Sequence, residues 1–148
     1  MKALLQRVSS ASVRVSDEVV GEIGAGLLAF VGMDKGDDQA IANRLLDKLL
    51  AYRVFADETG RMNRSVVDIQ GGVLLVSQFT LSADTGKGLR PGFSGALSPA
   101  AAEPLYDYLL SELCNRHKPV AAGRFGADMQ VSLVNNGPVT FLLECTSS

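Results

Sequence analysis

The chain has 148 residues, of which 47% are hydrophobic, and a formal net charge of −2 at pH 7. Its length fits a single domain over residues 1–148 with a buried core, and a charge this close to neutral excludes a general nucleic-acid binder that neutralises many phosphates. The sequence has no apolar run of the ~20 residues that span a membrane and no signal peptide, so we expect a cytoplasmic protein with no membrane partner.

The first third of the chain predicts strands followed by a helix. Residues 1–8 and residues 12–15 are predicted to form two strands, with apolar and polar residues alternating around Val13 and Val15. The continuous apolar run of residues 27–33 predicts a central strand buried on both faces. Apolar residues then recur at helical spacing from Ile41 to Tyr52, with Asp37 as the expected N-cap.

The middle of the chain predicts short strands and one long loop. Residues 54–56 indicate a short strand before a turn, and residues 73–81 indicate a longer strand after Gly71-Gly72. Residues 82–99 lack periodicity and contain four glycines and two prolines. We expect this segment to be functional, because long loops without secondary structure are uncommon in compact domains.

The last third predicts a second helix and two more strands. Ser98 is the expected N-cap, and Pro99 suits the first helical position. The buried face of this helix is predicted to carry Leu105, Leu109 and Leu113, with Tyr108 as a further candidate. Residues 129–134 and 139–143 read as strands joined by a turn at Gly137-Pro138. Two separate helices among many strands indicate an α+β fold with a β-sheet or barrel-like core.

Side chains typical of hydrolase and metal sites are scarce. The single histidine, His117, lies in a polar segment and is expected at the surface, outside any Ser-His-Asp arrangement. Cys114 and Cys145 lack metal-like spacing and are expected to be buried free thiols. A zinc site needs about three protein ligands, and Gly86-x-Gly88 does not match a dinucleotide fingerprint. We therefore expect no metal and no cofactor.

Two short segments carry most of the functional information. The first, Ser77-Gln78-Phe79-Thr80-Leu81, is a polar step at the end of an apolar run. If the strand continues, Ser77 and Phe79 share one face, and Gln78 and Thr80 share the other. The second is Asn135-Asn136-Gly137-Pro138-Val139-Thr140. By themselves these residues allow two interpretations. The first segment is a frayed strand end and the second an ordinary turn, or the two segments form a site that binds its ligand through main-chain atoms.

Taken together, the two segments resemble the D-aminoacyl-tRNA deacylase family, which also covers the D-tyrosyl-tRNA deacylases. The resemblance runs from Lys2 to Phe141. It implies a homodimeric proofreading hydrolase without a cofactor. Its expected substrates are D-aminoacyl-tRNA and mischarged glycyl-tRNA, bound at the aminoacylated 3′ end, and its expected products are free amino acid and tRNA. The resemblance also implies that L-aminoacyl-tRNA is rejected.

The resemblance assigns catalytic roles to the first segment. It implies that Ser77 and Gln78 line the pocket for the terminal adenosine and that the main-chain N–H groups of Phe79 and Thr80 face the ester carbonyl as an oxyanion hole. A threonine hydroxyl is a weak nucleophile without a base, and no base is evident beside Thr80. We therefore expect catalysis by positioning and electrostatics, with a ribose hydroxyl of the RNA assisting the attacking water.

The resemblance assigns selectivity to the second segment. It implies a cis Gly137-Pro138 bond that enters the active site of the partner subunit and occupies the space of an L side chain. Asn135 and Asn136 are candidates to brace this loop. The resemblance further implies that Arg7 holds the loop and that Met129 contributes to the adenine pocket.

Two other function classes remain open from the sequence. One is a non-catalytic RNA- or DNA-binding module that keeps the pocket; the other is a peptidyl or small-ester hydrolase with Thr80 as nucleophile. Local contacts to RNA phosphates would have to come from a few scattered cations. The candidates are Lys87, Arg90, Lys118 and Arg124.

Overall fold

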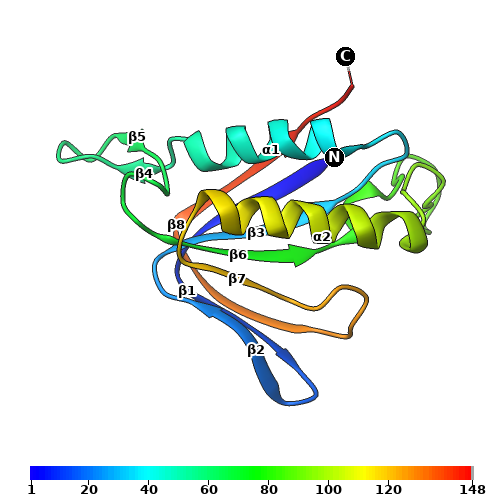
Figure 1. The fold of residues 1–148 in the computed structure, drawn as a ribbon, viewed down its shortest axis with the longest axis horizontal. Helices are drawn as coiled ribbons and strands as arrows, with labels where there is room; N and C mark the ends of the chain where they lie inside the picture. The colour runs from blue at the N-terminus through cyan, green and yellow to red at the C-terminus, as the bar shows by residue number, and fades with distance from the viewer. Residues whose placement is uncertain (148) are drawn as a thin grey trace.

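The computed structural model describes residues 1–147, and the described part of the chain combines strands with two α-helices and a short 3-10 helix (Figure 1). The elements are, in chain order, β1 (Lys2–Val15), β2 (Glu18–Ile23), β3 (Gly26–Gly32), α1 (Gln39–Ala51), β4 (Phe55–Ala56), β5 (Met62–Arg64), β6 (Gly72–Ser77), η1 (Phe79–Ser82), α2 (Pro99–Arg116), β7 (Val120–Ala122) and β8 (Gln130–Glu144). The predicted α+β class with two main helices is confirmed.

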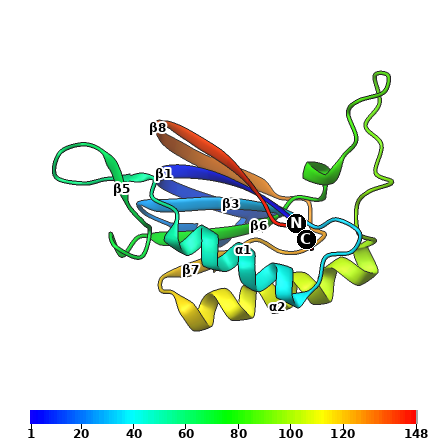
Figure 2. The same cartoon turned by 90° about the horizontal axis from the view of Figure 1, so that it is seen from above.

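Six strands form one strongly curved, barrel-like sheet. Its order is β2-β1-β3-β6-β7, and β8 pairs with β1. The pairings of β3 with β6 and of β6 with β7 are parallel, while β1 is antiparallel to its neighbours. Parallel neighbours need crossover connections, and the two crossovers contain α1 and α2. Both helices therefore lie on the same side of the sheet, as Figure 2 shows.

The sheet separates two hydrophobic cores. On the helix side, Leu27 and Ala29 of β3 pack against residues of α1 and α2. On the other side, Leu28 of the same strand packs within the curl of β1, β2 and β8. Because β3 is buried on both faces, its sequence is continuously apolar instead of alternating. The central strand predicted from residues 27–33 is confirmed.

The two N-terminal strands predicted from the sequence are one strand in the structure, so the predicted break at residues 9–11 is wrong. Strand β1 pairs with β8 along its length, but its register shifts between Gln6 and Val8 and again between Val8 and Ser10. Odd-numbered residues such as Ala3 and Leu5 face the helix-side core before these shifts, whereas Ala11 and Val13 face the second core after them. Continuous pairing with β8 keeps the strand intact through the polar segment.

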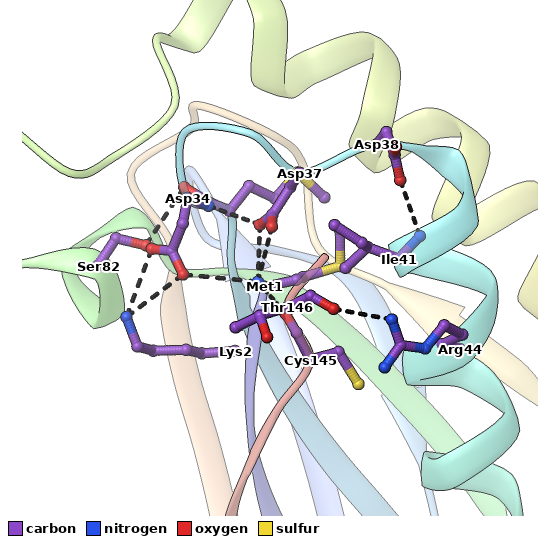
Figure 3. A network of polar contacts seen from close by, with 11 residues as sticks. Met1, Lys2, Asp34, Asp37, Asp38, Ile41, Arg44, Ser82, Cys145 and Thr146 are labelled. Atoms are coloured by element: carbon purple, nitrogen blue, oxygen red, sulfur yellow. Dashed lines mark hydrogen bonds and ion pairs between the residues drawn. The ribbon is translucent and has the colours of Figure 1, made fainter. Parts of the chain in front are cut away.

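The predicted N-cap of α1 is off by one residue, because Asp37 has a different partner. Asp38 is the N-cap, and its carboxylate accepts a hydrogen bond of 2.9 Å from the N–H of Ile41. Asp37 instead lies 2.8 Å from the α-ammonium group of Met1, which is itself buried (Figure 3). The carboxylate of Asp37 also accepts a hydrogen bond from the N–H of Asp34. The beginnings of β1 and α1 are thus joined by a buried ion pair.

Asp34 completes this network at its more exposed side. Its carboxylate lies 3.5 Å from the ammonium of Met1 and 3.3 Å from that of Lys2. Burial works against ionisation of Asp34. The Ser82 hydroxyl and the two ammonium groups outweigh burial and hold the pKa of this carboxyl below its ordinary value (Figure 3).

Two expectations about burial are corrected. His117 is buried, not exposed: its Nε2 lies 2.6 Å from the carbonyl oxygen of Gly71 and, because a carbonyl only accepts, donates the hydrogen bond. It caps the C-terminus of α2 where the chain turns back to the sheet. Both cysteines are free, as expected, but Cys114 is exposed on α2, and only Cys145 is buried. No helix within residues 1–147 has the length and hydropathy needed to cross a membrane.

Candidate active site

A cavity of about 690 Å³ lies where β6 ends. Its volume falls in the range of small-molecule sites. Its walls come from the ends of β3 and β6, the loop before α2, the N-terminal half of α2 and the connection from β7 to β8. Four of the residues singled out from the sequence line it: Ser77, Gln78, Phe79 and Met129.

The chain turns sharply at the mouth of this cavity. Strand β6 ends at Ser77, opposite Val31 of β3, and residues 79–82 form the 3-10 helix η1. The predicted strand over residues 73–81 is therefore too long, and the predicted alternation of faces from Ser77 to Thr80 is wrong. Strand β3 ends at Gly32, so beyond Ser77 the chain has no partner strand on that side. The last tie to β3 is a 2.8 Å hydrogen bond from the N–H of Gln78 to the carbonyl oxygen of Val31.

This turn leaves two main-chain donors unpaired. The first N–H groups of any helical turn lack an acceptor inside that turn. In residues 1–147, the N–H groups of Phe79 and Thr80 have no acceptor elsewhere either, whereas that of Leu81 is bound to the carbonyl oxygen of Gln78. Phe79 and Thr80 are both exposed. Two adjacent free N–H groups at the rim of a cavity are suited to bind an oxygen that gains negative charge.

The side chain of Thr80 lacks the surroundings of a nucleophile. Its hydroxyl oxygen accepts a hydrogen bond from the side-chain amide of Gln78. Within residues 1–147, no histidine or carboxylate hydrogen-bonds to this hydroxyl, and the only histidine of the chain is bound to Gly71. The chemistry available at this turn therefore comes from the main chain instead of an activated side chain.

Three aromatic residues line the cavity that were not candidate site residues in the sequence: Phe93, Tyr106 and Phe125. Helical spacing drew attention to Tyr108, but Tyr106 is the buried tyrosine of α2. Its hydroxyl donates to the carbonyl oxygen of Leu75 at 3.3 Å, and its ring lies 5.6 Å from that of Phe125. Burial, reinforced by the carboxylate of Asp107, raises the pKa of Tyr106 to about 12. Tyr106 thus adds a neutral aromatic wall at ordinary pH.

Signals for these residues were present but weak. Phe93 is a large aromatic residue inside a glycine-rich loop, a place where no core position is expected. Phe125 similarly stands between Arg124 and Gly126, next to the start of the last predicted strand. Neither position belongs to a periodic pattern, so only the folded chain shows that both rings meet at the cavity.

The segment that contains Gly137-Pro138 is a bulge and not a turn. Strand β8 runs through it without reversing, and both of its halves pair with β1. Gln6 is opposite Thr140 and Val8 is opposite Asn135, so residues 136–139 face the single residue Arg7. Residues 136–138 of this bulge are exposed, whereas Val139 is buried in the helix-side core. The Gly137-Pro138 peptide bond is cis, as is that of Lys118-Pro119.

Arg7 and Asn135 hold the bulge from two sides. Arg7 donates from Nε to the carbonyl oxygen of Asn136 at 2.8 Å and from Nη1 to that of Val54 at 2.7 Å. The side-chain oxygen of Asn135 accepts from the N–H of Val139 at 2.7 Å, and its amide donates to the carbonyl oxygen of the same residue. The predicted side-chain to backbone bonds are thus made by Asn135.

Glycine is required at position 137. Its φ is +145°, and a Cβ there would lie 2.6 Å from Cγ2 of Val139. A side chain at this position would have to displace the backbone or Val139. Gly137 and Pro138 are both exposed, so the backbone at the top of the bulge is open to contact.

The residues singled out from the sequence thus form two groups in the chain. Ser77, Gln78, Phe79 and Met129 surround the cavity, with Thr80 next to them in η1. Arg7, Gly137 and Pro138 meet at the bulge, and none of them lines that cavity. Within residues 1–147, no three His, Cys, Asp or Glu side chains converge as metal ligands.

Comparisons with known proteins identify close relatives. The family model described as D-Tyr-tRNA(Tyr) deacylase matches residues 4–144. The D-aminoacyl-tRNA deacylase of Stutzerimonas stutzeri (strain A1501) is 64% identical over 144 residues, which are 97% of this chain and 99% of the relative. The D-aminoacyl-tRNA deacylase of Cellvibrio japonicus (strain Ueda107) is 59% identical with the same coverage.

Solved structures share the fold. The structure titled "c-Myc DNA Unwinding Element Binding Protein" is 41% identical, with a TM-score of 0.94 over 99% of this chain and 100% of that chain. The structure titled "Structural Analysis of a probable eukaryotic D-amino acid tRNA deacylase" has a TM-score of 0.83 over 96% of this chain and 97% of that chain. Its 16% identity shows a common fold alone.

Proposed function

Because the chain belongs to the D-Tyr-tRNA(Tyr) deacylase family, we propose that it is a hydrolase that cleaves the ester bond of D-aminoacyl-tRNA. The products are free D-amino acid and tRNA, and the activity is proofreading of charged tRNA in the cytoplasm. One structural observation carries the chemistry: the N–H groups of Phe79 and Thr80 are unpaired at the rim of a cavity. That arrangement supports acyl chemistry without a side-chain nucleophile.

The proposed mechanism uses water as the nucleophile. The terminal nucleoside occupies the cavity, and the ester carbonyl oxygen accepts hydrogen bonds from the N–H groups of Phe79 and Thr80. Water attacks the carbonyl carbon, a ribose hydroxyl of the RNA takes part in moving its proton, and the bond from carbon to ribose oxygen breaks. The ribose oxygen leaves with a proton. Each well-placed donor to the oxyanion is worth roughly 10²–10³ in rate.

We propose that selectivity comes from a second copy of the chain. Residues 136–138 are exposed at the bulge, which is braced by Arg7 and Asn135 and lies outside the cavity of its own chain. In a homodimer, the bulge of each subunit would enter the cavity of its partner and occupy the space of an L side chain. D-aminoacyl groups and glycine escape this exclusion, so mischarged glycyl-tRNA is a further proposed substrate. L-aminoacyl-tRNA is rejected because it collides with fixed main-chain atoms.

Deacylation of matched D- and L-tyrosyl-tRNA tests this function. We expect rapid release of D-tyrosine and survival of the L ester at the same enzyme concentration. D-aminoacyl-tRNAs with large and small side chains should be cleaved at comparable rates, because the bulge excludes an L substituent at the α-carbon and does not contact a D side chain. Rapid cleavage of L-tyrosyl-tRNA, or equal cleavage of a D-tyrosine ester without RNA, would contradict the proposal.

A second candidate function is binding of nucleic acid without catalysis. It is favoured by one observation, the 41% identity to the structure titled as a DNA unwinding element binding protein. The net charge of −2 weighs against it, because affinity for a duplex rests largely on phosphate neutralisation. Titration of a labelled DNA duplex at several salt concentrations separates the candidates: a binding module binds tightly with a steep salt dependence and hydrolyses no aminoacyl-tRNA.

A further inference from the structure

Two phenylalanine rings stand exposed at the rim of the cavity. Phe79, the first residue of η1, is 63% exposed, and Phe93, in the loop before α2, is 39% exposed. Their ring centroids are 5.2 Å apart, with a tilt of 49° between the rings. Both residues line the cavity, and together they make a two-ring wall at its mouth. We call Phe79 and Phe93 the rim pair.

The position of Phe93 is set by hydrogen bonds on both sides of it. On one side, Asp84 and Gly92 exchange main-chain hydrogen bonds of 2.7 and 3.0 Å, which close the projecting part of the loop. On the other side, the carbonyl oxygen of Gly95 accepts from the N–H of Lys35 at 2.9 Å. Figure 2 shows the loop extending away from the sheet and helices, while its base returns to α2. Phe93 is therefore held at the base of the loop and not at its free tip.

The loop that carries Phe93 also carries charges that suit a nucleic acid. Lys87 and Arg90 are exposed on the same loop, and within residues 1–147 neither has a carboxylate within 4.0 Å. Exposed aromatic rings beside unpaired cations are the usual components of a surface for single-stranded RNA, because bases stack on the rings while cations attract the phosphates.

We propose that the rim pair stacks on the base of the penultimate nucleotide of the RNA, the nucleotide before the one that carries the amino acid. This inference rests on the proposed function, which places the terminal nucleoside in the adjoining cavity. The nucleotide that precedes it must leave the cavity past the rim pair. Phe93 is thus a positioning residue that fixes the direction in which the RNA strand leaves the cavity.

The ring geometry limits how the base binds. A base held between two rings would need the rings about 7 Å apart, twice the contact distance of carbon atoms. The rim pair is closer than that, with centroids 5.2 Å apart, so the base stacks on an outer face of the pair. A second copy of this chain is the other possible cover for exposed rings, and the experiment below separates it from RNA.

The test compares two truncated substrates. D-tyrosyl-adenosine carries the terminal nucleoside alone, and D-tyrosyl-CpA adds the penultimate nucleotide. We expect Phe93→Ala to lower kcat/KM for D-tyrosyl-CpA by about tenfold, the order that stacking of one base on one aromatic residue gives. The same variant should lower kcat/KM for D-tyrosyl-adenosine by a clearly smaller factor, because Phe93 also lines the cavity, and Phe93→Tyr should restore D-tyrosyl-CpA. Leu89→Ala, a fully exposed position in the same loop, is the matched control.

Several outcomes would overturn the proposal. An equal decrease in kcat/KM for both substrates would show that Phe93 shapes the cavity instead of binding the next base. No decrease for either substrate would show that the rim pair does not contact the RNA. If Phe93→Ala converts a dimer to a monomer in sedimentation, a second copy of the chain covers the rings.

A binding measurement keeps the inference separate from the proposed function. The chain has no tryptophan, so Phe93→Trp introduces a single indole whose emission reports stacking. Unacylated CpA should quench it at a concentration about tenfold lower than adenosine does, and Leu89→Trp should be quenched by neither. Quenching by CpA without any deacylation would sink the proposed function and keep the stacking role. Deacylation of D-tyrosyl-tRNA, together with equal quenching by CpA and adenosine, would support the proposed function and contradict the stacking role.

Discussion

Arg7 donates a hydrogen bond of 2.8 Å from its Nε to the carbonyl oxygen of Asn136, the residue directly before Gly137-Pro138. The same guanidinium donates at 2.7 Å to the carbonyl oxygen of Val54, at the end of the segment that follows α1. One side chain of β1 thus ties the bulge of β8 to a third part of the chain. A planar group with several donors can make both bonds at once, whereas an ammonium on a flexible stem cannot hold the same geometry.

We predict that Arg7→Lys lowers the ratio of kcat/KM for D-tyrosyl-tRNA to that for L-tyrosyl-tRNA by about tenfold, because a hydrogen bond from a charged donor contributes ~1.5–3 kcal/mol. The bulge would lose one of its braces and exclude an L side chain from the partner's cavity less strictly. Single-turnover deacylation measures the effect. Arg14→Lys is the control, since Arg14 also lies on β1 and donates to a main-chain carbonyl oxygen, that of Asp17. An equal effect in both variants would show that it comes from a general disturbance of β1 and not from the hydrogen bonds of Arg7.

The main-chain donors can be tested with a pair of substitutions at Phe79. Proline at this first position of η1 removes the free N–H without breaking a helical hydrogen bond, whereas Phe79→Ala keeps the N–H and removes the ring. We predict that Phe79→Pro lowers kcat by about 10²–10³ relative to Phe79→Ala, the range known for loss of one oxyanion donor. Equal kcat values for the two variants would rule out an oxyanion contact from this residue.

Thr80→Ala should keep at least about a tenth of wild-type kcat/KM, because loss of a true nucleophile costs far more, up to ~10⁶ in kcat. The substitution leaves the N–H of Thr80 in place and removes one methyl group and the hydroxyl, which is bonded to the amide of Gln78. Steady-state kinetics on D-tyrosyl-tRNA give the number. Intact-mass analysis after rapid acid quenching is the companion measurement, and an acyl group trapped on the wild-type chain would identify Thr80 as a nucleophile.

Complementation tests the cross-subunit site. Gly137→Ala damages the bulge but leaves the cavity intact, and Phe79→Pro does the opposite. After unfolding and refolding of an equal mixture, half of the dimers should be mixed. Each mixed dimer should hold one site with both an intact cavity and an intact bulge, so the mixture should have about a quarter of the wild-type number of sites that cleave the D ester and reject the L ester. Native mass spectrometry confirms that mixed dimers form. Mixed dimers that fail to combine cleavage of D-tyrosyl-tRNA with rejection of L-tyrosyl-tRNA would exclude a bulge that acts in the neighbouring subunit.

Two adjacent aspartates should differ sharply in their effect on stability. Asp37→Asn removes the negative partner of a buried ammonium group, and we predict a loss of roughly 3 kcal/mol in the free energy of unfolding. Asp38→Asn should change it by less than about 0.5 kcal/mol, because asparagine is as good an N-cap as aspartate. Urea denaturation followed by circular dichroism measures both. Similar values for the two variants would show that the ion pair of Met1 and Asp37 adds little.

The two helices show most clearly what can be predicted from the sequence. The spacing of apolar residues from Ile41 onwards located α1, and Ser98-Pro99 located the beginning of α2. The continuous apolar run at residues 27–33 located a strand buried on both faces. These features are local, because a repeat of 3.6 or 2 residues directly indicates which face of an element is buried. The segments at Ser77–Leu81 and Asn135–Thr140 likewise indicated the family before the fold was known.

The tertiary structure decided which partner each residue meets. Strand β6 ends at Ser77 because its neighbour β3 ends at Gly32, and this is why the N–H groups of Phe79 and Thr80 are unpaired. Residues 136–139 bulge because β1 pairs with β8 on both sides of Arg7. Asp37 binds the ammonium group of Met1 from 36 residues away. Ladder partners, bulges and ion pairs of this kind join segments that are distant in sequence, and local periodicity carries no information about them. The sequence by itself determined the two helices, the central strand and the family. The packing of the curved sheet placed two free donors beside a cavity and kept the bulge away from it.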